Sequence, residues 1–228
     1  MRLSKIGLNK TANVILGAGA SRGASCFKSA WAQSPLDTDF FDQLDRLKNL
    51  PEGRCLTELA EFARDEFGAS NELPMEAFYT QLESLNEFYE TLKIDRGPRV
   101  RAYRTQLDRF PTYLAAVFRS LRSICPSGGL DCDFHHLLAK TLHTGDSVIS
   151  FNYDCLMDEA LHAEARKSWD ARVGYGTSAT TGAQEWHDHS GKGRVSRNSI
   201  KLLKVHGSLN WVRNPDGSSI GRSSPIFS

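Results

Sequence analysis

The stretch VILGAGASRG, residues 14–23, places two glycines directly after a short apolar run. A buried strand that runs into a glycine turn and opens a helix can hold a phosphate, because backbone N–H groups point at the ligand and glycine permits its close approach. The fit to the dinucleotide fingerprint G-x-G-x-x-G is incomplete, since Arg22 occupies the third position and Gly23 comes one residue late. A plain tight turn is therefore the alternative. The residues expected to bind the pyrophosphate of a dinucleotide are Gly17, Ala18, Gly19, Ala20 and Ser21, the last through its hydroxyl.

The segment SFNYD ends a second apolar run with Asn152, Tyr153 and Asp154. An asparagine side chain carries both a donor and an acceptor and no charge, so Asn152 could hold a water molecule and a ribose hydroxyl together. The alternative is that Asn152 or Asp154 caps the helix that follows, a role for which both residue types are favoured.

The segment VHGSLNW ends a third apolar run with His206. Histidine can accept a proton near neutral pH, so His206 could serve as a general base toward water or a ribose hydroxyl. A hydrogen-bonded structural histidine is the alternative.

Three strands are predicted to position these residues, over 14–16, 147–151 and 200–205. Strands that alternate with helices, each ending in a polar turn of small residues, are typical of a parallel sheet. In such sheets the ligand crevice lies outside the carboxyl ends of the strands, so the three polar turns should face one crevice. The predicted fold class is α/β, a Rossmann-like parallel sheet with a helical insertion between the first and second recognisable strands.

Apolar residues at helical spacing fill residues 36–125, and Pro111 is expected to kink or break the last of these helices. Residues 168–199 contain almost no aliphatic residues and are predicted to form a long surface loop. No further strand is expected after Trp211. The expected division is a nucleotide-binding core of residues 1–35 and 126–228 and a helical insertion of residues 36–125.

Composition limits the classes of function. The 228 residues carry a formal net charge of +1, which gives no general attraction to nucleic acid or membranes. No apolar run approaches the roughly 18 residues needed to span a bilayer. Five irregularly spaced cysteines favour reduced thiols and a cytoplasmic location over a disulfide framework.

Taken in order, GAGAS, FNYD and LLKVHGSLNW resemble the SIR2-like (sirtuin-related) domain, in the branch of bacterial anti-phage defence proteins that hydrolyse NAD. The resemblance covers about residues 12–212. It implies that Asn152 and His206 are catalytic and that Asp154 contacts the amide of nicotinamide. It further implies that NAD is bound by Asp154 together with the glycine turn and the residues Gly207 and Ser208.

The chain also departs from that family. Deacylase sirtuins carry two C-x-x-C pairs that hold zinc, whereas no C-x-x-C occurs here, and the spacing of Cys125 and Cys132 matches no structural zinc site. No metal is therefore expected. Family members continue into strands that line the adenosine half of NAD, so the core is expected to be incomplete at its C-terminal end. The resemblance thus implies an additional C-terminal domain or regulatory partner, with activity gated by that partner or by homo-oligomeric assembly.

The predicted function is an NAD glycohydrolase that releases nicotinamide and ADP-ribose. Nicotinamide leaves as a neutral molecule, so the reaction depends on placing a water molecule at the anomeric carbon and needs no acid for the leaving group. The alternatives are a module that binds NAD or ADP-ribose without turnover, a zinc-less deacylase or ADP-ribosyltransferase, and an interaction module with a decayed site.

Overall fold

A three-stranded parallel sheet organises one side of the molecule. The computed structural model contains β1 (Asn13–Leu16), β2 (Ser147–Ser150) and β3 (Lys201–Lys204), in the order β1-β2-β3. All three strands are where the sequence predicted them, and their parallel pairing confirms an α/β fold with helices between the first two strands. The residues that the structure describes are 11–27, 31–68, 73–93, 97–125, 131–171, 174–175, 199–213 and 220–222.

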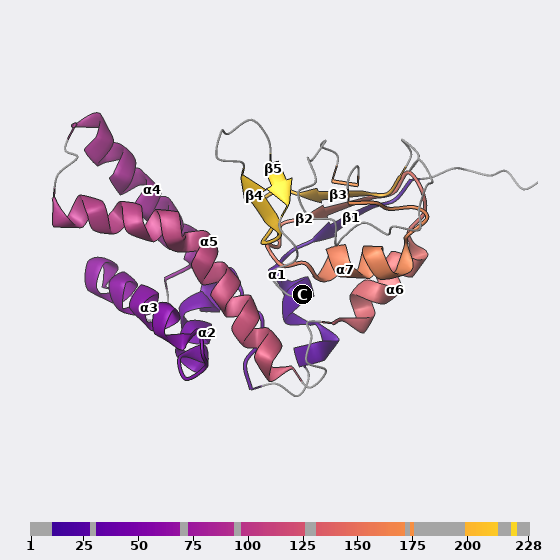
Figure 1. Cartoon of the computed structure of the whole chain (residues 1–228), viewed down its shortest axis with the longest axis horizontal. Coiled ribbons are helices and arrows are strands. Elements are labelled where there is room, and N and C mark those ends of the chain that lie inside the picture. The colour runs from indigo at the N-terminus through magenta and orange to yellow at the C-terminus, as the bar shows by residue number, and fades with distance from the viewer. Residues whose placement is uncertain are drawn as a thin grey trace, which may run out of the picture.

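Helices α6 (Asp133–Thr141) and α7 (Leu156–Glu164) cover one face of this sheet (Figure 1). The paired residues Val14, Val148 and Leu202 lie in one row across the three strands, and they pack against these helices. Val148 and Leu202 are fully buried, as expected for branched and aliphatic side chains between a sheet and a helical layer.

A surface loop was predicted over residues 168–199. This prediction is wrong for residues 168–171 and 174–175, which the structure describes. Trp169 and Tyr175 are buried in the core beneath the sheet, 2% and 3% exposed. The carbonyl of Gly174 accepts the N–H of Leu202 at 2.7 Å, so this segment runs beside β3. Aromatic side chains supply the buried apolar area here, although the segment contains almost no aliphatic residues. Residues 176–198 lie outside the described part of the chain.

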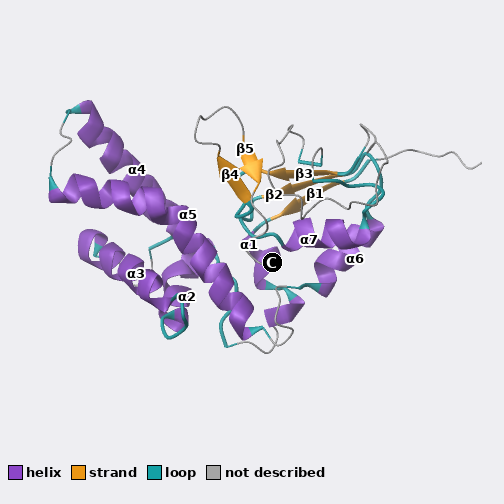
Figure 2. Cartoon of the chain, in the orientation of Figure 1, coloured by secondary structure: helices purple, strands orange, loops and turns teal. Residues whose placement is uncertain are grey.

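A block of helices lies between β1 and β2 in the sequence and forms a separate layer in Figure 2. Its members are amphipathic, and Gly68 ends the second of them in a left-handed conformation, with φ of 61°. The block comprises α2 (Phe40–Leu47), α3 (Gly53–Phe67), α4 (Met75–Thr91) and α5 (Pro98–Ile124), preceded by the 3₁₀ turn η2 (Asp37–Asp39).

Helix α5 continues through Pro111, so the expected break does not occur. The helix instead changes direction along its length (Figure 1). Proline removes one backbone hydrogen bond and its ring crowds the preceding turn, which bends a helix that packing on both sides keeps intact. Phe110 and Tyr113, on either side of the proline, are both buried.

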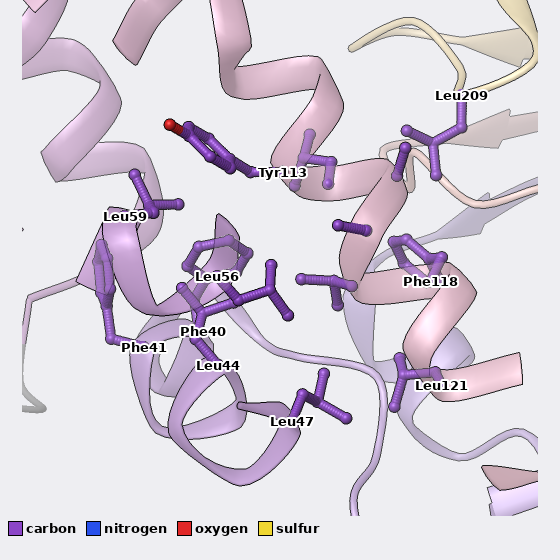
Figure 3. Packing of buried hydrophobic residues seen from close by; sticks show 14 of the residues in the cluster. Phe40, Phe41, Leu44, Leu47, Leu56, Leu59, Tyr113, Phe118, Leu121 and Leu209 are labelled. Carbon is purple, nitrogen blue, oxygen red and sulfur yellow. The ribbon is translucent and has the colours of Figure 1, made fainter. Parts of the chain in front are cut away.

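The helical block shares a hydrophobic cluster with segments that follow β2 and β3, while the strands themselves pack in a second cluster with α6 and α7. Figure 3 shows Leu209, from the segment after β3, in the same packed group as Phe118 and Leu121 of α5. Cys155 and Leu156 at the start of α7 belong to the same cluster. The helices are therefore held against the carboxyl ends of the strands, where the predicted site lies.

A short antiparallel pair, β4 (Trp211–Arg213) and β5 (Ile220–Arg222), follows the sheet. The expectation of no further strand after Trp211 is therefore wrong. These strands are only three residues long, too short for a periodic pattern to be recognised in the sequence. In the described part of the chain, no helix combines the length and the apolar character needed to cross a membrane.

Candidate functional site

A buried polar chain links the ends of β1 and β2. Asn152 Nδ2 donates to Ser21 Oγ at 2.8 Å, and the Ser21 hydroxyl donates in turn to Asp154 Oδ2. Ser21 belongs to α1 (Ala18–Arg22), which opens directly after β1, while the other two residues follow β2. All three side chains are at least nine-tenths buried. The structure thus joins residues of two predicted motifs that lie more than 130 positions apart in the sequence.

The direction of these hydrogen bonds determines what each group can offer. The sequence predicted that the Ser21 hydroxyl donates to a phosphate. In the structure its proton goes to the Asp154 carboxylate, so the hydroxyl is not free to do so. Its oxygen must accept from the amide nitrogen of Asn152, which leaves Asn152 Oδ1 as the remaining acceptor. Oδ1 is buried and has no hydrogen-bond partner among the described residues. A buried amide oxygen without a partner costs free energy, so it is a position where a ligand or water hydroxyl would be stabilised.

Asp154 has a structural role beside its place in this chain. Its second carboxylate oxygen, Oδ1, accepts the N–H of Leu156 at 3.0 Å and so satisfies an unpaired donor at the start of α7. The N-cap residue of α7 is Cys155, so Asp154 bonds the first N–H of the helix from the position before the N-cap. A carboxylate with both oxygens engaged and its side chain buried is rigidly oriented.

A pocket with a cavity volume of about 80 Å³ opens where the strand ends meet the helical block. Ser21, Asn152 and Asp154 line it on the sheet side. The helical side is largely apolar, and two carboxylates, Asp37 and Glu76, also line the pocket. The residues that supply the apolar and aromatic lining include Phe40, Met75, Leu114, Phe118, Phe151 and Tyr153.

The glycine turn borders this pocket through Ala18. Gly17 precedes α1 in an extended conformation, and the N–H of Ala20 donates to its carbonyl at 2.9 Å. A Cβ built on Gly17 or Gly19 would meet no atom within 4 Å. The described packing of the protein therefore does not require glycine at either position, and the space beside them is open to a ligand. Helix α1 has five residues, so its dipole contributes little to anion binding.

His206 lies beside the pocket and not in it. Its ring packs edge-on against Phe151 and Tyr153, two pocket residues, with centroids 5.5 and 5.8 Å apart. Its Nδ1 is 3.4 Å from the Tyr153 hydroxyl, and the side chain is exposed. Among the described contacts none joins His206 to Asn152 directly, and His206 contacts the two residues on either side of Asn152, Phe151 and Tyr153. Gly207 adopts φ of 86°, and Ser208 Oγ lies 3.9 Å from Cys155 Sγ.

A second buried hydrogen-bond network contacts the backbone of Asp154. It was not predicted from the sequence. Lys204 Nζ donates to the backbone carbonyl of Asp154 and forms an ion pair with Asp158 at 3.2 Å. Tyr175 donates its hydroxyl to the other oxygen of Asp158, and Asn210 Nδ2 donates to that hydroxyl at 3.2 Å. Burial would lower the pKa of Lys204, but the acidic groups of Asp158, Cys155 and Asp154 together raise it above the usual value. A signal was present, because Lys204 occupies an inward position of a buried strand, where an unpaired lysine is not tolerated.

Cys155, which directly follows the pocket residue Asp154, is buried. Burial raises the pKa of the Cys155 thiol, so it stays protonated and unreactive. Within the described residues, no group of three or more histidine, cysteine, aspartate or glutamate side chains is arranged to hold a metal ion. The histidines at 187 and 189 lie outside the described residues.

Comparison of the chain with models of known protein families gives no match, and comparison with curated proteins gives none either.

Proposed function

We propose that the pocket binds NAD and that the protein hydrolyses it to nicotinamide and ADP-ribose. The observation that carries the proposal is the chain Asn152–Ser21–Asp154, in which Asn152 is a pocket residue whose buried Oδ1 has no hydrogen-bond partner among the described residues. An acceptor held in this way can orient the attacking water or a ribose hydroxyl at the anomeric carbon. Orientation is the main requirement of a reaction whose leaving group departs uncharged.

The charge of the pocket favours the nicotinamide end of NAD. Asp37 and Glu76 line it together with phenylalanine, methionine and leucine side chains. A cationic aromatic ring is stabilised by nearby carboxylates and by apolar contact, whereas phosphates would be repelled. The pyrophosphate would then lie over the open space beside Gly17 and Gly19, where backbone approach is unobstructed.

His206 would act from the rim through Tyr153. If Nδ1 carries the proton and donates to the Tyr153 oxygen, then Nε2 is free to accept a proton from water or a ribose hydroxyl. Burial, with Glu76 and Glu83 nearby, raises the pKa of Tyr153, which keeps its phenol neutral. General-base assistance of this kind is typically worth about 10²–10⁴-fold in rate.

We further propose, on the three motifs quoted above, that the chain belongs to the SIR2-like group, with a Rossmann-like core of residues 1–35 and 126–228 and an insertion of residues 36–125. The parallel order β1-β2-β3 with the helices between β1 and β2 supports this arrangement. A role in bacterial anti-phage defence, a cytoplasmic location, homo-oligomeric assembly and a regulatory partner are parts of the same proposal.

The direct test is release of nicotinamide from NAD by the purified chain, together with calorimetric titration of NAD. We expect release by the wild type and a loss of at least 100-fold in Asn152→Ala and in His206→Ala. Because both residues serve one step, the double variant should lose little more than either single variant. His136→Ala is the matched control, since His136 pairs with Asp131 and Glu164 and is not among the pocket residues.

Three outcomes separate the alternatives. Binding of NAD without release would favour a sensor module. Full activity in His206→Ala would contradict the assignment of His206 as general base, but it would not contradict NAD binding in the pocket. Neither binding nor release by the folded wild type would contradict the proposal as a whole.

A further inference from the structure

The charged side chains that line the pocket are all acidic. Asp37 and Glu76 line it from the helical block, and Asp154 lines it from the segment after β2. Among the described lining residues there is no lysine or arginine. Arg22 of α1 is not among them, and its guanidinium pairs with Asp39 at 2.6 Å. The lining therefore carries negative charge that no lining cation balances.

The carboxylate of Asp37 is held in place by the helix that follows it in space. Its Oδ1 accepts the N–H of Glu76 at 2.7 Å, which joins η2 to the first turn of α4. Among the described contacts none engages Asp37 Oδ2 or the carboxylate of Glu76. Both groups can therefore interact with a ligand in the pocket.

The rest of the lining suits a single flat ring. The aromatic side chains of Phe40, Phe118 and Tyr153 line the pocket, and the faces of aromatic rings attract cations. Asn152, a lining residue that is 7% exposed, adds an amide oxygen without a hydrogen-bond partner among the described residues. The cavity volume of about 80 Å³ is well below the roughly 300–1,000 Å³ of pockets that enclose drug-sized ligands. The pocket thus has room for one small ring and not for a whole dinucleotide.

We propose that the pocket selects its ligands by charge, binding pyridinium cations in preference to neutral rings of the same shape. The ligand class is nicotinamide substituted on its ring nitrogen, whether or not a ribose is the substituent. Asp37 and Glu76 are the residues that determine this specificity. Two opposite unit charges about 4 Å apart attract strongly enough to change affinity about fivefold even in bulk water.

Charge selection has a consequence for product release, and this consequence rests on the proposed function. When water cleaves the C–N bond, the electron pair of that bond stays on the ring nitrogen. The water oxygen bonds to the anomeric carbon and a proton is released. The ring thereby loses its positive charge, and with it the attraction of the two carboxylates. Nicotinamide should therefore leave readily and compete poorly with NAD.

The experiment measures binding of three small probes to the full 228-residue chain by ligand-observed NMR titration. The probes are nicotinamide methylated on its ring nitrogen, nicotinamide itself, and meta-toluamide, which is the neutral carbon isostere of the methylated cation. We expect the cation to bind at least tenfold more tightly than either neutral probe. Its affinity should fall as the ionic strength is raised from about 0.01 to 0.15 M, because salt screens partly exposed charges.

Variants test the two carboxylates directly. Asp37→Asn and Glu76→Gln each remove one negative charge, and Asp37→Asn keeps an oxygen for the N–H of Glu76. We expect each variant to bind the cation at least threefold more weakly and the double variant at least tenfold, with the neutral probes unaffected. Glu87→Gln is the matched control, since it removes the same charge from an exposed position of α4 that does not line the pocket. Thermal unfolding shows whether each variant is folded.

The outcomes distinguish this inference from the proposed function. Equal affinity for the cation and its neutral isostere, or full affinity for the cation in the folded double variant, would overturn charge selection even if NAD is hydrolysed. Preference for the cation that is lost in the double variant would support charge selection even if no nicotinamide is released from NAD.

Discussion

Asn152 Nδ2 lies 2.8 Å from Ser21 Oγ, and this hydrogen bond joins the carboxyl ends of two neighbouring parallel strands. The bond has two consequences for the site. It orients the asparagine amide so that its oxygen is the available acceptor, and it commits the serine hydroxyl to Asp154. Ser21 therefore acts as a positioning residue. The effect of substituting it on activity and stability can be measured separately from the effect of substituting Asn152.

Ser21→Ala should lower both stability and activity. The substitution leaves Asn152 Nδ2 and Asp154 Oδ2 buried without this partner, which should reduce the free energy of unfolding by about 1–3 kcal/mol. Nicotinamide release should fall at least tenfold, because the amide of Asn152 is no longer held in one orientation. Denaturant unfolding and the nicotinamide assay measure the two effects. Ser123→Ala is the control, since that hydroxyl only donates to the carbonyl of Ser120 within α5, and equal behaviour of the two variants would contradict the assigned role.

Gly19→Ala should separate ligand binding from folding. The position is helical and a Cβ there meets nothing within 4 Å, so alanine should raise the free energy of unfolding by up to about 1 kcal/mol. The same methyl group would obstruct a phosphate, and we expect NAD binding to weaken at least tenfold in calorimetry. Gly53→Ala gives the opposite pattern, because its Cβ would lie 1.8 Å from the carbonyl oxygen of Lys48 and should destabilise the fold. Unchanged NAD affinity in Gly19→Ala would place the pyrophosphate elsewhere.

Lys204→Met should be strongly destabilising. The Lys204 and Asp158 side chains are 1% and 0% exposed, and removing the cation leaves a buried carboxylate without its ion pair. The free energy of unfolding should fall by about 3–5 kcal/mol in denaturant titrations. Adding Asp158→Asn should recover part of that loss, because the unpaired charge is removed. In contrast, Arg54→Met breaks an exposed pair with Glu58 and should cost less than about 1 kcal/mol; a similar cost for both would show that Lys204 is not desolvated.

Glu159 should make the stability of the protein depend on pH. Burial, with Asp158 nearby, raises the pKa of its carboxyl from 4.5 to about 7. Between these two values the folded state binds a proton that the unfolded state has lost, so stability is greatest at low pH and falls as the pH rises through 7. Glu159→Gln should therefore raise the free energy of unfolding at pH 8, by the order of 1–2 kcal/mol, and change it little at pH 4. Unfolding curves at the two pH values provide the measurement, with the exposed Glu87→Gln as control; an equal gain at both pH values would contradict the assigned burial.

The sequence alone determined the elements and the order in which they occur. Branched and aliphatic residues at 14–16, 147–151 and 200–205 predicted three strands, and the structure pairs them in parallel. Periodic apolar residues predicted the helices between the first two strands. These features follow from local periodicity, which a single segment displays by itself. The hairpin after Trp211 was missed because its strands are too short for such a pattern.

Only the tertiary structure decided which side chains meet and in what direction their protons point. Ser21 had been assigned to a phosphate and instead donates to Asp154, because packing brings a carboxylate from 133 residues away. Tyr175 had been placed on a surface loop and instead lies buried against Asp158. In the sequence Lys204 is a charged residue within an apolar strand, and only the structure identifies Asp158 as its ion-pair partner. Hydrogen-bond partners across such separations depend on strand register and helix packing, and neither is encoded in any one segment of the chain.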